Sequence, residues 1–175
     1  MVIEVSPLVH IEVVVRDAER AYQFLHNIFG AEKVEEDLAE NLSSIGLVKA
    51  IHIQLGNIII QFIEPSGDEI ETTWSKFLKE KGPGVHNLTF RVKDIKKSAK
   101  AFKKEGVKTE LKFRVDWTKL LDPEELSDKP PKVYMIGGDE IVGFKFELSE
   151  NPWKEDKVPE GFKIKATYDM KREKN

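Results

Sequence analysis

The sequence predicts an α+β fold built from two βαβββ modules that form a cup-shaped mixed sheet. One observation is a repeated order of a strand, a helix and further strands, first over residues 8–64 and again over 85–150. A second is that each helix follows an aspartate and ends before a glycine, Asp17 and Gly30 in the first copy and Asp94 and Gly106 in the second. Such matched helix signals indicate that one supersecondary unit occurs twice.

The first module covers residues 1–66. Its opening segment, 8–15, alternates between apolar positions and a face that carries His10 and Glu12, which is typical of a strand with one polar-leaning face. Apolar residues in 17–29 recur at helical spacing. Two strands, 47–55 and 58–64, follow and are joined by a tight turn at Gly56-Asn57.

A connecting helix within 67–83 leads to the second module, 84–150. This module has a strand at 85–92, a helix at 94–106 and further strands at 108–115, 132–138 and 144–150. It also carries an insertion, 116–131, whose length suggests a flap and in which Asp122-Pro123 is expected to start a short helix. The charged tail, 151–175, contains one weak candidate edge strand at 161–168.

Composition narrows the classes of function. No run approaches the ~18 apolar residues of a membrane-spanning helix, and the N-terminus lacks the pattern of a secretory signal, so we expect a cytoplasmic protein with no membrane partner. A net charge of -3 with both signs interspersed gives no reason to expect nucleic acid. Because the chain has no cysteine, a metal site could use only His, Asp, Glu, Asn and Gln.

Several stretches together resemble the vicinal oxygen chelate superfamily. They are "VHIEVVVRDAERAYQFLHNIFG", "IIIQFIEP", "KFLKEKGPGVHNLTFRVKDIKKSAKAFKKEGV" and "GFKFELSE". This superfamily includes glyoxalases, methylmalonyl-CoA epimerases, dioxygenases and bleomycin-resistance proteins, and the likeness is greatest to methylmalonyl-CoA epimerase. The resemblance covers about residues 8–150 and implies a glyoxalase-like fold that holds a divalent metal ion, with Co, Zn, Mn, Fe and Mg as candidates.

The resemblance also implies the ligands of that metal. By position, His10 and Gln61 match the ligands of the first module, and Glu147 matches the last ligand of the second. In an enzyme of this kind Glu147 would serve both as ligand and as catalytic base.

The remaining ligand position is ambiguous. The ligand histidine of the family lies seven residues before the helix-starting aspartate, as His10 does before Asp17, but the residue seven before Asp94 is Asn87. Strand alternation likewise predicts that Asn87 faces the cleft and that His86 points away. A one-residue bulge would turn His86 inward, so His86 remains a candidate metal ligand.

These features predict a metal-dependent epimerase or lyase that removes a proton beside a carbonyl group. His52 shares a strand face with Ala50 and Gln54, so it could enter the cup as a second base. The resemblance implies a small-molecule substrate, for which an acyl-CoA thioester is one candidate, and leaves a homodimer open. Two alternatives remain: an iron-dependent dioxygenase, which needs two imidazoles and a carboxylate, and a metal-free binding module of the bleomycin-resistance type.

Overall fold

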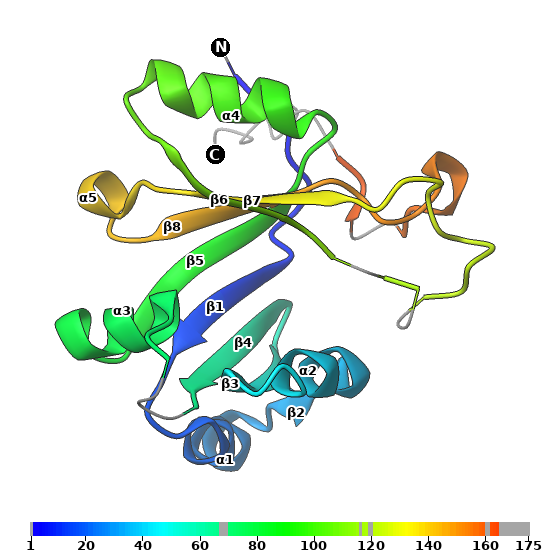
Figure 1. Cartoon of the computed structure of the whole chain (residues 1–175). Helices are drawn as coiled ribbons and strands as arrows, with labels where there is room; N and C mark the ends of the chain where they lie inside the picture. Colours follow the sequence, from blue (N-terminus) through cyan, green and yellow to red (C-terminus); the bar gives the residue numbers. More distant parts are fainter. Residues whose placement is uncertain (1, 67–69, 116, 119–120, 160–161, 165–175) are drawn as a thin grey trace, which may run out of the picture. The chain divides into compact units, whose positions relative to one another are not determined.

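A computed structural model of the protein describes residues 2–66, 70–115, 117–118, 121–159 and 162–164. Its elements, shown in Figure 1, are β1 (His10–Val14), α1 (Ala18–Phe29), β2 (Glu32–Lys33), α2 (Glu36–Ser43), β3 (Val48–Leu55), β4 (Ile58–Pro65), α3 (Thr73–Lys81), β5 (Gly84–Arg91), α4 (Ile95–Lys104), β6 (Thr109–Arg114), β7 (Lys132–Ile136), α5 (Asp139–Val142) and β8 (Lys145–Ser149). Both parallel and antiparallel strand pairs occur. The predicted α+β fold with a repeated βαβββ order is confirmed.

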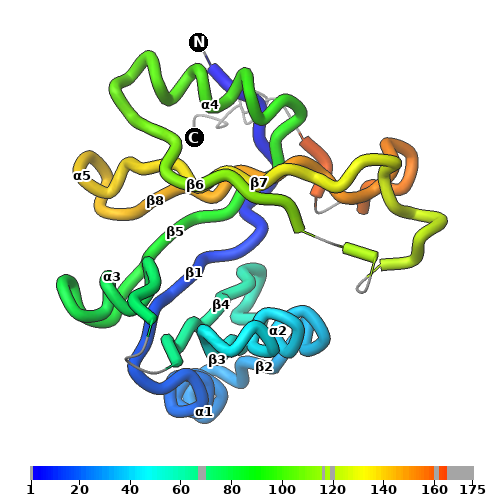
Figure 2. The backbone as a smooth tube through the Cα atoms, in the orientation of Figure 1, coloured from blue at the N-terminus to red at the C-terminus, as the bar shows by residue number. Residues whose placement is uncertain are grey.

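The chain divides into two compact units. We call His10–Leu88 the first unit, and Met1–Val9 together with Thr89–Asn175 the second unit. The trace in Figure 2 passes from β1 into α1 in the first unit and from the end of β5 into α4 in the second. The module boundaries proposed from the sequence, 1–66, 67–83, 84–150 and 151–175, remain a prediction.

In the first unit the strands lie in the order β2-β3-β4-β1. Strand β1 runs parallel to β4, and β3 runs antiparallel to β4. Asp17 caps α1 by accepting a hydrogen bond from the backbone N–H of Arg20 at 2.9 Å, and Gly30 ends the helix with φ 68°. One sheet face is apolar and packs against α1 through Ile51, Ile53 and Phe62. These local signals explain why α1 was predicted almost to the residue.

The opposite face of this sheet packs partly against α2. Ala39 on α2 lies in one buried cluster with Val48, Ala50 and Ile63. Neither β2 nor α2 was predicted from the sequence. Strand β2 has only two residues, and the residue before α2, Glu35, makes no side-chain capping bond, so neither element carries the usual local signal.

The second unit contains the antiparallel order β8-β7-β6. Asp94 caps α4, and this helix packs Ile95 into a buried cluster with Val92, Tyr134 and Leu148. Residues near the N-terminus pair with the end of β5, because the N–H of Ser6 donates to the carbonyl of Arg91 at 3.0 Å. The short helix α5 was not predicted.

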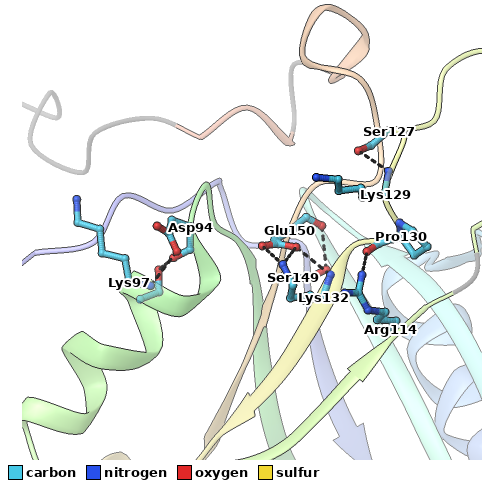
Figure 3. A network of polar contacts seen from close by, with 10 residues as sticks. Asp94, Lys97, Arg114, Ser127, Lys129, Pro130, Lys132, Ser149 and Glu150 are labelled. Carbon is cyan, nitrogen blue, oxygen red and sulfur yellow. Dashed lines mark hydrogen bonds and ion pairs between the residues drawn. The ribbon is translucent and has the colours of Figure 1, made fainter.

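Part of the insertion 116–131 is described, and at Asp122-Pro123 it forms a turn over 123–125 rather than the short helix expected there. The Asp122 carboxylate accepts the N–H of Glu124 at 2.9 Å, which closes the turn locally, and the double proline at 130–131 prevents a helix from continuing. Figure 3 shows Arg114 of β6 donating to the carbonyl of Pro130 at 2.6 Å. The insertion is therefore anchored to the strand that precedes it.

The candidate edge strand at 161–168 lies largely outside the described residues. Among the residues that are described, none of the helices has the length and apolar character needed to cross a membrane.

Candidate functional site

A row of buried polar side chains crosses the sheet of the first unit. His52 on β3 is paired in register with Gln61 on β4, and Gln61 is paired with Glu12 on β1. Residues that pair across neighbouring strands point to the same face, so these three side chains lie side by side on the face opposite α1. All three are buried, and each therefore needs hydrogen-bond partners within the protein.

His52 lies at the centre of a network formed by Glu35, His52 and Gln61, which we call the His52 network. The Nδ1 atom of His52 is 2.9 Å from Oε2 of Glu35, and the amide Nε2 of Gln61 is 2.7 Å from the Nε2 of His52. Because an amide nitrogen only donates, Nε2 of His52 must accept, and the ring proton sits on Nδ1 and is donated to Glu35. In this arrangement Nε2 of His52 presents a lone pair to the Gln61 amide.

His10 lies beside this network. The ring centroids of His10 and His52 are 6.2 Å apart, and the rings are tilted by 32°. Alternation along β1 places His10 on the same face as Glu12. The structure thus brings together His10, His52 and Gln61, three of the residues selected from the sequence.

A cavity of about 320 Å³ opens beside His52, between α2 and the strands β2 and β3. This volume is at the lower end of the range for small-molecule pockets, enough for a small acyl group but not for a whole coenzyme A. Ala39, Ala50 and His52 line the cavity together with charged side chains of both signs. The charged residues are Lys33, Glu36, Glu40 and Lys49.

Lys33, at one edge of the cavity, is held by a carboxylate of α1. Its Nζ atom lies 3.2 Å from Oε2 of Glu19 and 4.7 Å from the centre of the Tyr22 ring. The side-chain hydrogen bond from Gln23, followed by that from Lys33, lowers the pKa of Glu19 below its usual value. The ammonium group is therefore paired with an ionised carboxylate at neutral pH.

His86 belongs to a second buried network in the same unit, the His86 network, formed with Thr73, Trp74 and Glu12. Its Nδ1 atom lies 2.5 Å from Oε1 of Glu12, and its Nε2 atom lies 3.4 Å from Oγ1 of Thr73. The indole N–H of Trp74 also donates to Glu12, at 2.9 Å. Simple alternation predicted that His86 points away from the polar face, and this was wrong: the buried carboxylate of Glu12 requires donors, and His86 supplies one.

Ligation of a metal ion by His10, Gln61, Glu147 and His86 remains a prediction, and within the first unit two of these side chains are bonded to other protein groups. The amide of Gln61 is bonded to His52, and both ring nitrogens of His86 have protein partners. Over the described part of the chain, no group of three or more His, Asp or Glu side chains is placed to hold a metal ion. Glu147 lies on β8 in the second unit, so its predicted convergence with His10 remains a prediction.

Glu35 is the site residue that sequence reasoning missed. It stands in a run of acidic residues ahead of a helix that was itself not recognised, and its spacing to His52 matches no known motif. Only the folded structure joins the two side chains.

The sequence matches the model of a known protein family. The family model for the glyoxalase/bleomycin resistance protein/dioxygenase superfamily matches residues 9–116. No protein with a curated description matches the sequence.

Several solved structures share the fold at low sequence identity. A methylmalonyl-CoA epimerase from Mycobacterium tuberculosis is 19% identical with a TM-score of 0.55, over 83% of this chain and 88% of that one. A methylmalonyl-CoA epimerase in complex with methylmalonyl-CoA and NH4+ is 18% identical with a TM-score of 0.54, over 84% and 95%. A variant of the Streptomyces coelicolor epimerase with 2-nitronate-propionyl-CoA is 19% identical with a TM-score of 0.53, over 84% and 98%. The chain therefore belongs to the glyoxalase/bleomycin resistance protein/dioxygenase superfamily, as its strand and helix motifs indicated.

Proposed function

We propose that the protein is an epimerase or lyase that transfers a proton at the carbon beside a carbonyl group, with His52 as the base. The observation that carries this proposal is the state of His52. Its Nδ1 is bonded to a carboxylate, its Nε2 is a proton acceptor, and the residue lines a cavity of about 320 Å³. An imidazole held in one tautomer beside a cavity is suited to act as a general base.

The proposed step moves one proton. Nε2 of His52 takes the proton from the carbon, and the electron pair of the C–H bond remains on the substrate as an enolate. Binding of the substrate requires Gln61 to exchange its bond to His52 for one to the substrate, and the freed amide N–H can then donate to the enolate oxygen. Return of a proton to the opposite side gives the epimer, whereas loss of a group from the neighbouring carbon gives the lyase product.

The sequence predicted Glu147 as metal ligand and catalytic base and His52 as the second base; we now propose Glu147 as the second acid or base, on the strength of its position on the last strand. A divalent ion, if bound, would be expected to use His10, Gln61 and Glu147 as the family does. Because the bonds of Gln61 and His86 do not favour such a centre, no step proposed here depends on a metal.

A small acyl thioester is the substrate class we propose. The related epimerase structures contain methylmalonyl-CoA and a propionyl-CoA analogue. The cavity beside His52 has room for the acyl group of such a compound.

The test is hydrogen exchange. Incubating the protein with a 2-substituted malonyl thioester in deuterium oxide should introduce deuterium at the carbon beside the carbonyl, detected by mass spectrometry. His52→Gln should lower the exchange rate by a factor of about 10² to 10⁴. His26→Gln is the matched control, because His26 lies on α1 and bonds the carbonyl of Ala31 at 2.8 Å, away from the cavity lining.

The same assay decides the role of a metal. It is run on protein treated with chelator and on protein supplied with Zn, Co, Mn, Fe or Mg, with metal content measured in parallel. Absence of exchange under every condition would remove the epimerase and lyase assignment.

A metal-free binding module is the second candidate. It is favoured by the hydrogen bonds that engage Gln61 and His86 within the protein. In that case the thioester or another small molecule would bind without any exchange. The dioxygenase alternative is less favoured, since the imidazoles of His52 and His86 are each paired with a carboxylate rather than directed to a shared point.

A further inference from the structure

We infer that Glu35 is a positioning residue that holds His52 in the tautomer with a basic Nε2. Its strained, left-handed backbone directs its carboxylate to Nδ1 of His52. The role of the tautomer in catalysis rests on the proposed function, whereas the contact and the tautomer do not.

The backbone of Glu35 is unusual. Its dihedral angles are φ 50° and ψ 40°, and among the described residues it is the single non-glycine residue with positive φ. A side chain with a Cβ atom disfavours this left-handed conformation, which glycine adopts readily and asparagine tolerates. A glutamate therefore occupies a position where the backbone conformation favours another residue.

Local capping does not explain the choice of glutamate. Glu35 occupies the N-cap position of α2, where Ser, Thr, Asp or Asn in an extended conformation is preferred. Its side chain makes no capping hydrogen bond to α2. Its carboxylate instead reaches Nδ1 of His52, seventeen residues further along the chain, at 2.9 Å.

The surrounding backbone holds Glu35 in place. The N–H of Val34 donates to the carbonyl of His52 at 3.0 Å, and the N–H groups of Leu38 and Ala39 both donate to the carbonyl of Glu35 at 3.0 Å. At the other end of α2, Oγ of Ser43 accepts the N–H of Ala50 at 2.9 Å. Because α2 is bonded to β3 at both ends, the left-handed turn at Glu35 directs its carboxylate toward His52.

His52 and Glu35 differ in their exposure to solvent. The His52 side chain is 0% exposed, whereas the Glu35 side chain is 34% exposed. After His52 takes a proton from the substrate, the ionised carboxylate stabilises the imidazolium, and the Nδ1 proton can exchange with water through Glu35.

The test separates positioning from a merely structural ion pair. Nitrogen-15 NMR of the histidine rings in the full chain should show Nδ1 of His52 protonated and Nε2 unprotonated. Glu35→Gly removes the acceptor of the Nδ1 proton, and the Gln61 amide can then turn its oxygen toward Nε2, so this variant should give a mixture of tautomers and lower deuterium exchange into the thioester at least about tenfold. Glycine relieves the left-handed strain but leaves the buried Nδ1–H without an acceptor, so these two effects offset and the Tm should stay close to that of the wild type.

Two further variants complete the design. Glu35→Gln keeps an oxygen that can accept from Nδ1, so it should retain the tautomer and restore part of the exchange rate lost in Glu35→Gly. Glu32→Gln is the matched control, since the Glu32 side chain is 72% exposed and lies outside the cavity lining. Its His52 spectrum should equal that of the wild type.

The results that overturn the inference are defined independently of turnover. A His52 protonated on Nε2 in the wild type would do so, as would a Glu35→Gly variant with an unchanged His52 spectrum and a lower Tm. A wild type that shows the predicted tautomer but no deuterium exchange would instead count against the proposed function and leave the Glu35 contact established.

Discussion

Glu12 provides the sharpest test of the buried polar row. It is 3% exposed and accepts two hydrogen bonds, from the indole N–H of Trp74 at 2.9 Å and from Nδ1 of His86 at 2.5 Å. Glu12→Leu keeps a similar volume but leaves the buried His86 donor and the partly buried Trp74 donor without an acceptor. At roughly 1–3 kcal/mol for each of these two donors, the free energy of unfolding should fall by about 2–6 kcal/mol.

Urea unfolding, followed by tryptophan fluorescence and circular dichroism, measures this loss. For a chain of 175 residues this loss corresponds to a fall in Tm of about 4–24 °C. Glu80→Leu is the control, because Glu80 is an exposed residue of α3, and it should change stability by no more than about 0.5 kcal/mol.

The double variant Glu12→Leu/His86→Leu identifies the cause of the loss. If the His86 imidazole left without an acceptor causes the loss, removing it should recover part of the stability. The summed losses in free energy of unfolding of Glu12→Leu and His86→Leu should then exceed the loss in the double variant. A loss below about 1 kcal/mol for Glu12→Leu, or strict additivity in the double variant, would refute the network described here.

Two other predictions concern local features. Asp94→Ala removes the N-cap of α4, which accepts the N–H of Lys97 at 2.9 Å, and should lower the free energy of unfolding, measured in urea, by about 1 kcal/mol. Asp17→Ala should lower it by a similar amount, because it removes the cap of α1. An unchanged free energy of unfolding in either variant would contradict the capping assignment. Glu19 has a pKa lowered by its hydrogen bonds from Gln23 and then Lys33, so its contribution to stability is present above the ordinary carboxyl pKa and is lost as the pH falls through the lowered value. Carboxyl NMR should show this midpoint below that of an exposed glutamate, and Lys33→Met should raise it.

Local signals in the sequence determined the helices and most strands. The aspartate caps and the glycine at the end of α1 lie within a few residues of the turns they form, and apolar periodicity extends along each element. The helix predicted at 17–29 is observed at Ala18–Phe29, and the strand predicted at 58–64 is observed at Ile58–Pro65. Helix α2 escaped prediction because its start depends on the left-handed Glu35, which packing against β3 maintains.

The candidate site, too, was predicted only in part from the sequence. The family resemblance selected His10 and Gln61, and alternation along its strand selected His52; the strand register of the folded sheet is what puts the three on one face. The partners of these residues were decided by tertiary structure. His86 meets Glu12 across 74 positions of sequence, and Glu35 meets His52 across 17. A buried polar group must find its hydrogen-bond partner wherever the fold brings one within about 3 Å, and no pattern of neighbouring residues encodes that distance.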